Sequence, residues 1–360
     1  MASKPTILVT GICGNIGRRL LPQLSDFQVI GTDIREPESQ QNLFRFDKID
    51  LAEERSCDQL LDLLRAYGPE AVVHLGFVDS PARTLQLDSP SLWAVNVAGT
   101  SRVIEAIAEH NRMGGAIEQF VFPSSALVYG PTPRLPVQED ARLDARGLIY
   151  ALQQQEADLT VQSRAANLRR VKTYILRLHF LAGAGTENHT LALLRGNPAG
   201  KSFVAGRLRR RGKRLALMLP SKGDYLDHKF QFVHVDDVAR LVSNIVHRHQ
   251  PDGSLTVLNV AGRGDALSLR RCTEIAQLPV KHLPGIGLCR KAFNFLWNHG
   301  ISEVPPEVLP YILGACVLET ARLRVFLGEH YRSVIQSTCE EALTESFAPA
   351  RQHSLATQST

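Results

Sequence analysis

Two hydrophobic periodicities alternate along the first half of the chain. Short runs of β-branched and apolar residues, the pattern of strands buried on both faces, occupy residues 6–10, 27–32, 71–75, 117–122 and 172–178. Segments with apolar residues at helical spacing lie between them, at residues 18–24, 56–66, 91–110 and 150–169. Phe44 and Phe46 mark a further short strand. Strands that alternate with helices in this way predict an α/β protein with a parallel sheet.

After residue 182 the alternation becomes irregular. We predict a Rossmann-like, doubly wound parallel sheet built from residues 1–182, to which residues 230–262 return with a strand, a helix and another strand. Residues 183–229 and 263–347, with many glycines and prolines, are predicted to form a smaller, discontinuous C-terminal substrate lobe. Residues 348–360 are polar and are predicted to form a flexible tail.

Composition narrows the class of protein. Of the 360 residues, 44% are hydrophobic and 21% are charged, which is typical of a globular protein rather than a disordered one. No apolar stretch approaches the roughly 20 residues of a membrane span, so no membrane partner is expected. The net charge of +5 allows an anionic small-molecule substrate without requiring nucleic acid. The six cysteines are scattered without zinc spacing, so we expect a cytoplasmic protein with no metal.

A glycine-rich turn directly follows the first predicted strand. In TGICGNIG, the glycines permit a tight turn and a close approach of the backbone to a diphosphate. The helix that follows offers free N–H groups and the positive end of its dipole. The turn is therefore predicted to bind a dinucleotide through Gly11, Cys13, Gly14, Asn15, Ile16 and Gly17.

An acidic residue ends the second predicted strand. The carboxylate of Asp33 could accept hydrogen bonds from both ribose hydroxyls of NAD, and it would repel the 2′-phosphate of NADP. We therefore expect NAD as the cofactor, with NADP less favoured. Arg35, two residues further on, could soften this preference.

The glycine turn and the acid after the second strand, together with further motifs, make the sequence similar to the extended short-chain dehydrogenase/reductase family, which includes NAD-dependent epimerases and dehydratases. The likeness extends over roughly residues 5–347, and its specificity comes from the order and spacing of several motifs. These are TGICGNIG, AVVHLGF at 71–77, NVAGT at 96–100, PSSALVYG at 123–130, ILRLHFLAGAG at 175–185 and FVHVDDVARL at 232–241. The resemblance implies a homodimer that pairs through the helices near 91–110 and 150–168.

The resemblance also implies roles for individual residues. Asp50 and Leu51 would contact the adenine, and Asn96 would hold a helix in place near the active site. Ser125 would orient and polarise a substrate hydroxyl or carbonyl, while Tyr150 would be the general acid/base. The cofactor channel would be lined by Leu75, Gly76 and Phe77. We expect His179 and His234 to be hydrogen-bonded core residues rather than catalysts.

One position of the family's YxxxK motif differs in this chain. Four residues after Tyr150 the family has lysine, whereas this chain has Gln154, and residues 149–163 contain no lysine or arginine. Tyrosine has an ordinary pKa of about 10, and a neighbouring cation lowers it by roughly 1–3 units. Glutamine can keep a hydrogen bond to the cofactor but supplies no charge. Gln154 therefore predicts slow redox chemistry at neutral pH, chemistry that does not need an ionised tyrosine, or no chemistry at all.

Further departures affect the substrate side. Phe180 and Phe230 stand where sugar-nucleotide epimerases of the family have an asparagine and an arginine that bind a diphosphate, although Lys229 could substitute for the arginine.

A strongly basic stretch lies within the predicted substrate lobe. The stretch RLRRRGKR at 207–214 has six basic residues in eight positions. It could be a solvated loop, an anion site or a docking site for nucleic acid or an acidic protein. No aromatic residue interleaves the arginines, which makes nucleic acid unlikely as a partner.

Three functions are consistent with this sequence. In the first, the protein is an NAD(P)-binding oxidoreductase or epimerase that transfers hydride at a hydroxyl or carbonyl carbon of a small substrate. In the second, it is a catalytically impaired NAD(P)-binding sensor or scaffold. In the third, it is a lyase or dehydratase with a different base, such as His179 or Asp224. The three candidate catalytic positions are Ser125, Tyr150 and Gln154. The substrate itself is not determined by the motifs.

Overall fold

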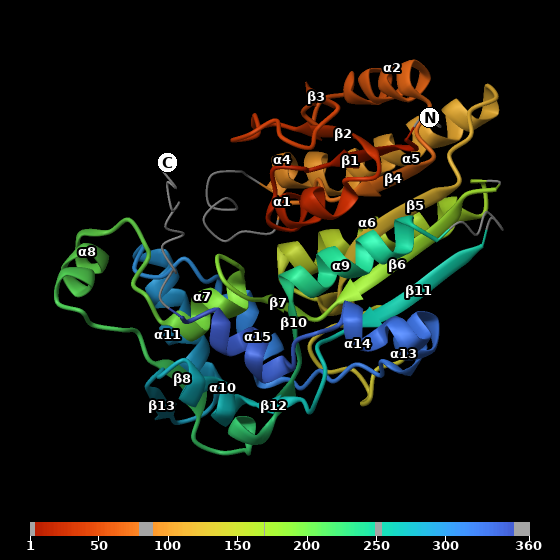
Figure 1. Cartoon of the computed structure of the whole chain (residues 1–360). Coiled ribbons are helices and arrows are strands. Elements are labelled where there is room, and N and C mark those ends of the chain that lie inside the picture. Colours follow the sequence, from red (N-terminus) through yellow and green to blue (C-terminus); the bar gives the residue numbers. More distant parts are fainter. Residues whose placement is uncertain (1–3, 79–88, 169, 249–253, 349–360) are drawn as a thin grey trace, which may run out of the picture.

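A computed structural model describes residues 4–78, 89–168, 170–248 and 254–348 (Figure 1). Its centre is a seven-stranded sheet in which every neighbouring pair of strands is parallel. In spatial order the strands are β11 (Leu255–Val260), β6 (Lys172–Leu178), β5 (Gln119–Ser125), β4 (Ala71–His74), β1 (Thr6–Thr10), β2 (Gln28–Asp33) and β3 (Arg45–Lys48). The predicted doubly wound α/β fold is confirmed.

Helices cover both faces of this sheet, as the two apolar cores show. Along β1, Ile7 and Val9 pack into one core, while Leu8 packs into the core on the opposite face. The first core contains residues of α1 (Asn15–Leu20) and α9 (Val235–Val246). The second core contains residues of α2 (Ser56–Tyr67), α5 (Gly99–Arg112) and α6 (Ile149–Ala165). Because both of its faces are buried, the inner strand β1 is apolar along its centre, Ile7–Val9.

The order of the strands reverses beside β1. After β1 the chain builds β2 and β3 on one side, and then β4, β5, β6 and β11 on the other. In open parallel sheets, such a reversal leaves a crevice at the carboxyl ends of the strands where ligands bind. The loop after β1 and the loop after β4 flank this crevice.

Two predicted elements differ from the structure in detail. The helix expected over residues 91–110 begins as α4 (Ser89–Trp93) and passes through a single π-helical turn, Ala94–Ala98, before α5. The strand expected to end before Pro123 continues to Ser125. Proline is tolerated there because β4 pairs with β5 only as far as Val121, so that edge of β5 is open beyond this point.

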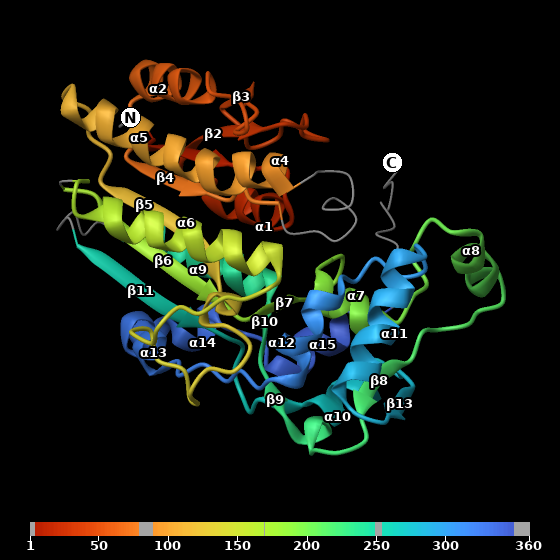
Figure 2. The same cartoon turned by 180° about the vertical axis from the view of Figure 1, so that it is seen from behind.

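The remaining segments form a second layer of structure below the carboxyl ends of the sheet, as Figures 1 and 2 show. It contains three two-stranded sheets, β7 (Phe180–Ala182) with β10 (Phe232–His234), β9 (Lys229–Phe230) with β12 (Leu267–Ser268), and β8 (Leu217–Pro220) with β13 (Val280–Leu283). Its helices are α7 (His189–Arg195), α8 (Phe203–Arg210), α10 (Leu269–Ile275), α11 (Ile286–Asn298), α12 (Leu309–Leu313) and α15 (Cys339–Glu345). The helices α13 (Ala321–Leu327) and α14 (Tyr331–Val334) instead pack into the core that α1 and α9 share with the main sheet.

The strand at 232–234 was expected in the main sheet, and that expectation is wrong. It pairs with β7 instead, because β11 already occupies the outer edge of β6. The helix α9 and the strand β11 do lie where they were expected, on the face and at the edge of the main sheet. None of the helices that the structure describes is long and apolar enough to cross a bilayer.

Candidate functional site

A cavity of about 380 Å³ lies at the carboxyl ends of β1, β4, β5 and β6. Eleven of the residues predicted from the sequence line it: Gly11, Cys13, Gly14, Asn15, Ile16, Gly17, Leu75, Phe77, Ser125, Tyr150 and Gln154. These residues come from four separate stretches of the chain. The fold therefore brings the predicted phosphate loop and the predicted catalytic positions to one hollow.

Five predicted residues are not part of this lining: Asp33, Asp50, Leu51, Gly76 and Asn96. The Asp50 side chain accepts a hydrogen bond from the Ala52 backbone N–H at 2.9 Å. A Cβ added at Gly76 would lie 2.7 Å from the side chain of Leu51, so these two residues are packed together. Contact of these five with a cofactor stays a prediction.

The glycine loop is held in place by backbone contacts that no side chain could replace. Gly11 has a φ of +69°, and a Cβ there would lie 2.6 Å from the carbonyl carbon of Leu75. A Cβ at Gly17 would lie 2.4 Å from the carbonyl oxygen of Ile12. The Gly11 N–H donates to the carbonyl of Thr32 at 2.7 Å, which ties the loop to β2. The loop is therefore preformed, as a diphosphate cradle requires.

Asp33 stands directly behind this loop. Its Oδ2 accepts from the Cys13 backbone N–H at 3.0 Å, and its Oδ1 accepts from the Arg35 N–H at 3.1 Å. The Arg35 guanidinium lies over the loop and donates to the Cys13 carbonyl at 3.3 Å. Burial, aided by the Asp33 charge, raises the pKa of the Cys13 thiol, which keeps it neutral. Arg35 thus lies in the cavity wall, whereas Asp33 is not part of the lining.

The candidate catalytic residues meet on the opposite wall. Tyr150 lies in the first turn of α6, and its hydroxyl accepts a hydrogen bond from Nε2 of Gln154 at 3.4 Å. The ring of Phe77 packs edge-on against Tyr150 with 5.8 Å between centroids. Ser125 ends β5, and its Oγ accepts from the Leu127 N–H at 3.2 Å. Ser125 and Tyr150 both line the cavity.

Gln154 leaves one polar atom unsatisfied. Its side chain is 3% exposed, and its Oε1 has no hydrogen-bond partner in the described part of the chain. A buried amide oxygen without a partner costs roughly 1–3 kcal/mol. A ribose hydroxyl of a bound dinucleotide could donate to it, so the residues present fit such a cofactor at both the glycine loop and Gln154.

Asn96 and His74 form a buried polar chain beneath the cavity. Asn96, on the π-helical turn, accepts from the Val78 N–H at 2.8 Å and donates to Gln153 Oε1 at 2.8 Å. Thr100 donates its hydroxyl proton to the Asn96 carbonyl, so it accepts from Nε2 of His74 at 3.0 Å. Burial lowers the pKa of His74 to about 4. His74 is therefore a neutral structural link.

A buried ion pair holds the catalytic helix against the sheet. The guanidinium of Arg177, on β6, bonds both carboxylate oxygens of Asp158 on α6, at 2.9 and 3.0 Å. The Ser124 hydroxyl donates to the same carboxylate at 2.6 Å. Burial opposes the charge on Arg177, but the bonds and charge of Asp158 outweigh it and raise its pKa. The pair fixes Tyr150 and Ser125 relative to each other, because it joins α6 to the end of β5.

Three histidines near the cavity are held neutral. The ring of His179 donates from Nε2 to the Cys316 carbonyl at 2.9 Å and accepts at Nδ1 from the Phe180 N–H at 2.8 Å. Burial lowers the pKa of both His179 and His189 to about 4, as it does for His74. His179 is thus a core residue, as the sequence predicted. His189 lines the cavity, and its Nδ1 has no partner among the described residues.

The two phenylalanines that the resemblance placed at phosphate-binding positions have different surroundings. Phe180 lines the cavity, and its ring packs against Phe230 and Phe232 at 6.0 and 5.9 Å. Phe230 is buried behind it in the core of the lobe. The exposed Lys229 is not part of the cavity lining. The arginines that do line the cavity, Arg18 and Arg35, lie at the glycine-loop end.

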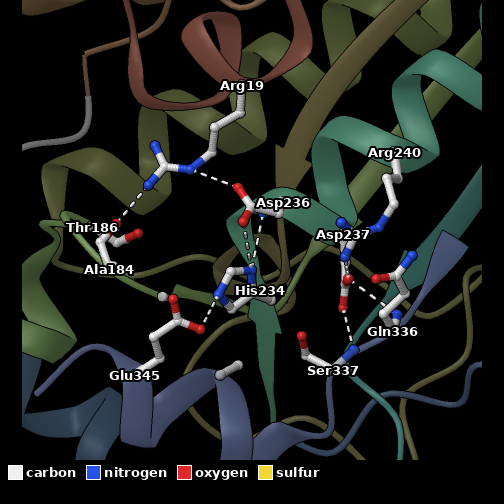
Figure 3. A network of polar contacts seen from close by, with 12 residues as sticks. Arg19, Ala184, Thr186, His234, Asp236, Asp237, Arg240, Gln336, Ser337 and Glu345 are labelled. Atoms are coloured by element: carbon white, nitrogen blue, oxygen red, sulfur yellow. Dashed lines mark hydrogen bonds and ion pairs between the residues drawn. The ribbon is translucent and has the colours of Figure 1, made fainter. Parts of the chain in front are cut away.

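An ion pair connects the helix after the glycine loop to α9, and a hydrogen bond connects it to the loop after β7 (Figure 3). Arg19 of α1 pairs with Asp236 at 2.7 Å and donates to the Ala184 carbonyl at 2.6 Å. His234 contacts Glu345 at 2.9 Å and caps α9, a structural role in agreement with the sequence analysis. The loop that carries Ala184 continues into the cavity wall, so α1 touches the wall of the substrate side directly.

Sequence reasoning missed the residues that lead into α7 and begin it. Glu187, Asn188, His189 and Thr190 all line the cavity, yet they lie beyond the end of the motif at 175–185 and no other motif marks them. The only local signal is Asn188, whose Oδ1 accepts from the Leu191 N–H and so caps α7. A helix cap is common and says nothing about a binding site.

The fold and the motifs agree with one protein family. The profile of the NAD dependent epimerase/dehydratase family matches residues 7–261, which is more than half of the chain. This chain belongs to that family. The dependence of the family on NAD agrees with the cofactor predicted from the glycine loop and Asp33.

Curated proteins with a similar sequence match this chain over only part of their own length. A UDP-glucose 4-epimerase of Mycolicibacterium smegmatis is 33% identical over 143 residues, which are 37% of this chain and 43% of the relative. A UDP-glucose 4-epimerase of Pisum sativum is 30% identical over 159 residues, 40% of this chain and 43% of the relative. The matches thus span about two-fifths of each relative.

Solved structures of similar fold align with almost the whole length of this chain. The UDP-glucose 4-epimerase of Thermus thermophilus in complex with NAD has a TM-score of 0.64 at 18% identity, covering 95% of this chain and 97% of that one. The enzyme WbmH of Bordetella bronchiseptica in complex with NAD+ has a TM-score of 0.63 at 17% identity, with the same coverage. At this identity the likeness establishes the fold alone.

Proposed function

We propose that this protein is an NAD-dependent oxidoreductase or epimerase that acts on a carbon bearing a hydroxyl or carbonyl group in a small substrate. The observation that carries the proposal is the convergence of the glycine loop with Ser125, Tyr150 and Gln154 on one cavity. The similarity to UDP-glucose 4-epimerases supports the reaction class, while the phenylalanine at position 180 leaves the substrate open.

The residues of the cofactor half have distinct tasks in this proposal. The backbone around Gly11, Gly14 and Gly17 would surround the diphosphate, and Asp33 would accept bonds from the adenosine ribose. When it is bound, NAD supplies the acceptor for a hydride from the substrate carbon. Gln154 Oε1 would accept a hydrogen bond from the second ribose, which satisfies a buried oxygen that otherwise has no described partner.

The residues of the substrate half would move one proton. Ser125 would orient the substrate hydroxyl, and the Tyr150 oxygen would take its proton as hydride leaves the same carbon. A tyrosine with the ordinary pKa of about 10 is ionised in about one molecule in a thousand at pH 7. Since position 154 supplies an amide where the family has an ammonium group, we expect turnover to be slow at neutral pH and to rise toward alkaline pH.

A second copy of the chain is the expected partner. On α6, Ile149, Leu152 and Leu159 recur at helical spacing and are 38–46% exposed. Trp93 of α4 is also exposed and donates to Glu156 on α6 at 2.7 Å. Exposed apolar residues that share a helix face are typical of a helix-pairing interface. This supports a homodimer that pairs through α6 and its neighbour α5.

Gln154→Lys tests the proposal at the position where the chain departs from its family. The new ammonium group would lower the pKa of Tyr150 by roughly 1–3 units, which predicts about a tenfold or larger gain in kcat at pH 7. We expect the alkaline limb of the pH–rate profile to move down by the same number of units. Steady-state rates with NAD and a panel of hydroxylated substrates measure both.

Tyr150→Phe is the matched control for this experiment. It removes only the hydroxyl, so it should abolish turnover in both the wild-type and the Gln154→Lys background while NAD binding, followed by calorimetry, is kept. Turnover that survives Tyr150→Phe would contradict the proposal. If NAD binds but Gln154→Lys creates no turnover, the protein is better described as a dinucleotide sensor or scaffold.

A further inference from the structure

The positive charge of this chain is concentrated in two segments of the lobe. Residues 188–223 contain nine lysines and arginines and no aspartate or glutamate, and residues 275–302 add three more with no acid. These twelve are part of a total of 41, so the rest of the chain has 29 basic residues against 36 acidic ones. The net charge of +5 is thus the sum of two strongly basic segments and a remainder of the chain that is acidic.

The fold places these two segments side by side. The strand β13 pairs with β8, and the N–H groups of Gly200 and Ser202 donate to the carbonyls of Ile301 and Gly300 at 3.1 and 3.0 Å. Both α8 and α11 lie at the same end of the molecule, opposite the main sheet, in the two views of Figures 1 and 2. There α8 stands out beyond the rest of the lobe.

Large apolar side chains are exposed beside these charges. The side chain of Phe203, at the start of α8, is 76% exposed, and Val204 is 49% exposed. On α11, Ile286, Leu288 and Phe295 are between 44% and 54% exposed. An exposed phenylalanine at the tip of a projecting basic helix is not explained by packing, because its ring contributes little to the core.

The basic residues of α8 and of the four positions after it, 211–214, divide into two groups. Arg209 donates to the carbonyls of Pro198 and Gly200, and Arg214 donates to four backbone carbonyls, so both hold the lobe together. Of the carboxylates that the structure describes, none pairs with any of four exposed cations: Arg207, Arg210, Arg211 and Lys213. These four are therefore available to an external anionic partner.

We propose that α8 and α11 form a basic, apolar surface through which the protein docks peripherally on a membrane rich in anionic phospholipid. Each basic group near such a surface gains from its negative potential, while phenylalanine and leucine enter the boundary between headgroups and acyl chains. The anionic surface of such a membrane is extended, and it is complementary in charge to the cluster of basic residues on the projecting α8. The expectation of no membrane partner rested on the lack of a span, and a peripheral contact needs none.

Sedimentation of the full chain with lipid vesicles tests this surface. We expect the protein to pellet with vesicles of equimolar phosphatidylcholine and phosphatidylglycerol at low salt, and to stay in solution with phosphatidylcholine alone or at high salt. The combined variant Arg207→Gln, Arg210→Gln, Arg211→Gln and Lys213→Gln should lose at least about tenfold in vesicle affinity. Phe203→Ser should lose roughly threefold to tenfold without any change in charge.

A matched variant controls for net charge. Replacing Arg45, Arg55, Arg112 and Arg164 with glutamine removes the same number of exposed cations from the opposite end of the molecule, and it should leave vesicle binding unchanged. None of the replaced residues belongs to the cofactor cavity, so NAD binding and the thermal midpoint check that each variant is folded.

Three results would overturn the proposal. The first is absence of the wild-type protein from the anionic vesicle pellet at low salt. The second is an equal loss of binding in the two four-residue variants, which would mean that net charge alone is responsible. The third is binding of duplex DNA as tight as that of vesicles together with no effect of Phe203→Ser, which would indicate a surface for polyanions in general.

Discussion

The two ends of the cavity differ in how their geometry is maintained. At the cofactor end, glycines at 11 and 17 pack backbone against backbone, and the Asp33 carboxylate is fixed by backbone N–H groups. At the substrate end, the wall consists of side chains from α6, β7 and the segment before α7. Backbone geometry requires particular residues, whereas a wall of side chains accepts many, which explains why the family pattern is intact at one end and altered at the other.

The largest effect is expected beneath the substrate end, at the buried ion pair. Arg177→Met leaves Asp158 as an unpaired charge with no exposed surface, which should lower the free energy of unfolding by about 3–5 kcal/mol. Urea unfolding followed by circular dichroism measures the loss. Arg164→Met breaks an exposed pair with Glu105 and should cost about 0.5 kcal/mol. Equal losses in the two variants would show that the buried pair does not hold the site together.

Gly11→Ala probes the cofactor end directly. A Cβ at this position would overlap the Leu75 backbone, so the loop must shift, and we expect NAD affinity to fall by about 100-fold, or about 2.7 kcal/mol. Gly68→Ala is the matched control, since its φ of +54° is also left-handed but nothing lies within 4 Å. Both variants should lose about 1 kcal/mol of stability from the backbone alone. Calorimetry that finds similar NAD affinity in both would contradict the role of the loop.

Stability should fall in mild acid because of the buried histidines. The pKa values of His74, His179 and His189 are lowered to about 4, while an unfolded chain has about 6.5. Between these values the unfolded chain binds more protons, so stability decreases as pH falls from about 6.5 toward 4. Each histidine contributes a slope of up to about 1.4 kcal/mol per pH unit.

His74→Gln checks this explanation at the cofactor end. The variant should be less stable than the wild type at pH 7, because two hydrogen bonds change, but its unfolding free energy should depend less steeply on pH between 6 and 5. Denaturant titrations at several pH values give the slope. A slope identical to that of the wild type would mean that His74 does not titrate with unfolding.

The smallest effect on stability is expected at the contact between the cofactor end and the substrate end of the cavity. Arg19→Met removes the ion pair with Asp236 and the bond to the Ala184 carbonyl, both partly exposed, so stability should change by about 1 kcal/mol or less. If this contact couples the ends, KM for NAD and KM for the substrate should both rise a few-fold while kcat stays constant. Asp236→Asn should give the same pattern, and an unaltered substrate KM would show that the ends are independent.

Particular residues show how far sequence reasoning reached. The strand at 172–178 and the glycine turn lie where they were predicted, because each is determined by neighbours within a few positions. Asp33 was placed at the end of the correct strand, where its carboxylate accepts hydrogen bonds from the Cys13 and Arg35 N–H groups, and its contact with a ribose stays a prediction. His189 was not predicted at all, because its place depends on the path of an irregular segment.

The sequence by itself determined the succession of most strands and helices along the chain, the glycine turn and the acid that follows it, because these depend on local periodicity and on residue identity at fixed spacing. Only the tertiary structure decided that Arg177 and Asp158 pair in the core, that β10 pairs with β7 rather than with the main sheet, and that residues 187–190 line the cavity. Those outcomes depend on which distant segments compete for the same neighbours, and such competition is settled only when the whole chain has packed.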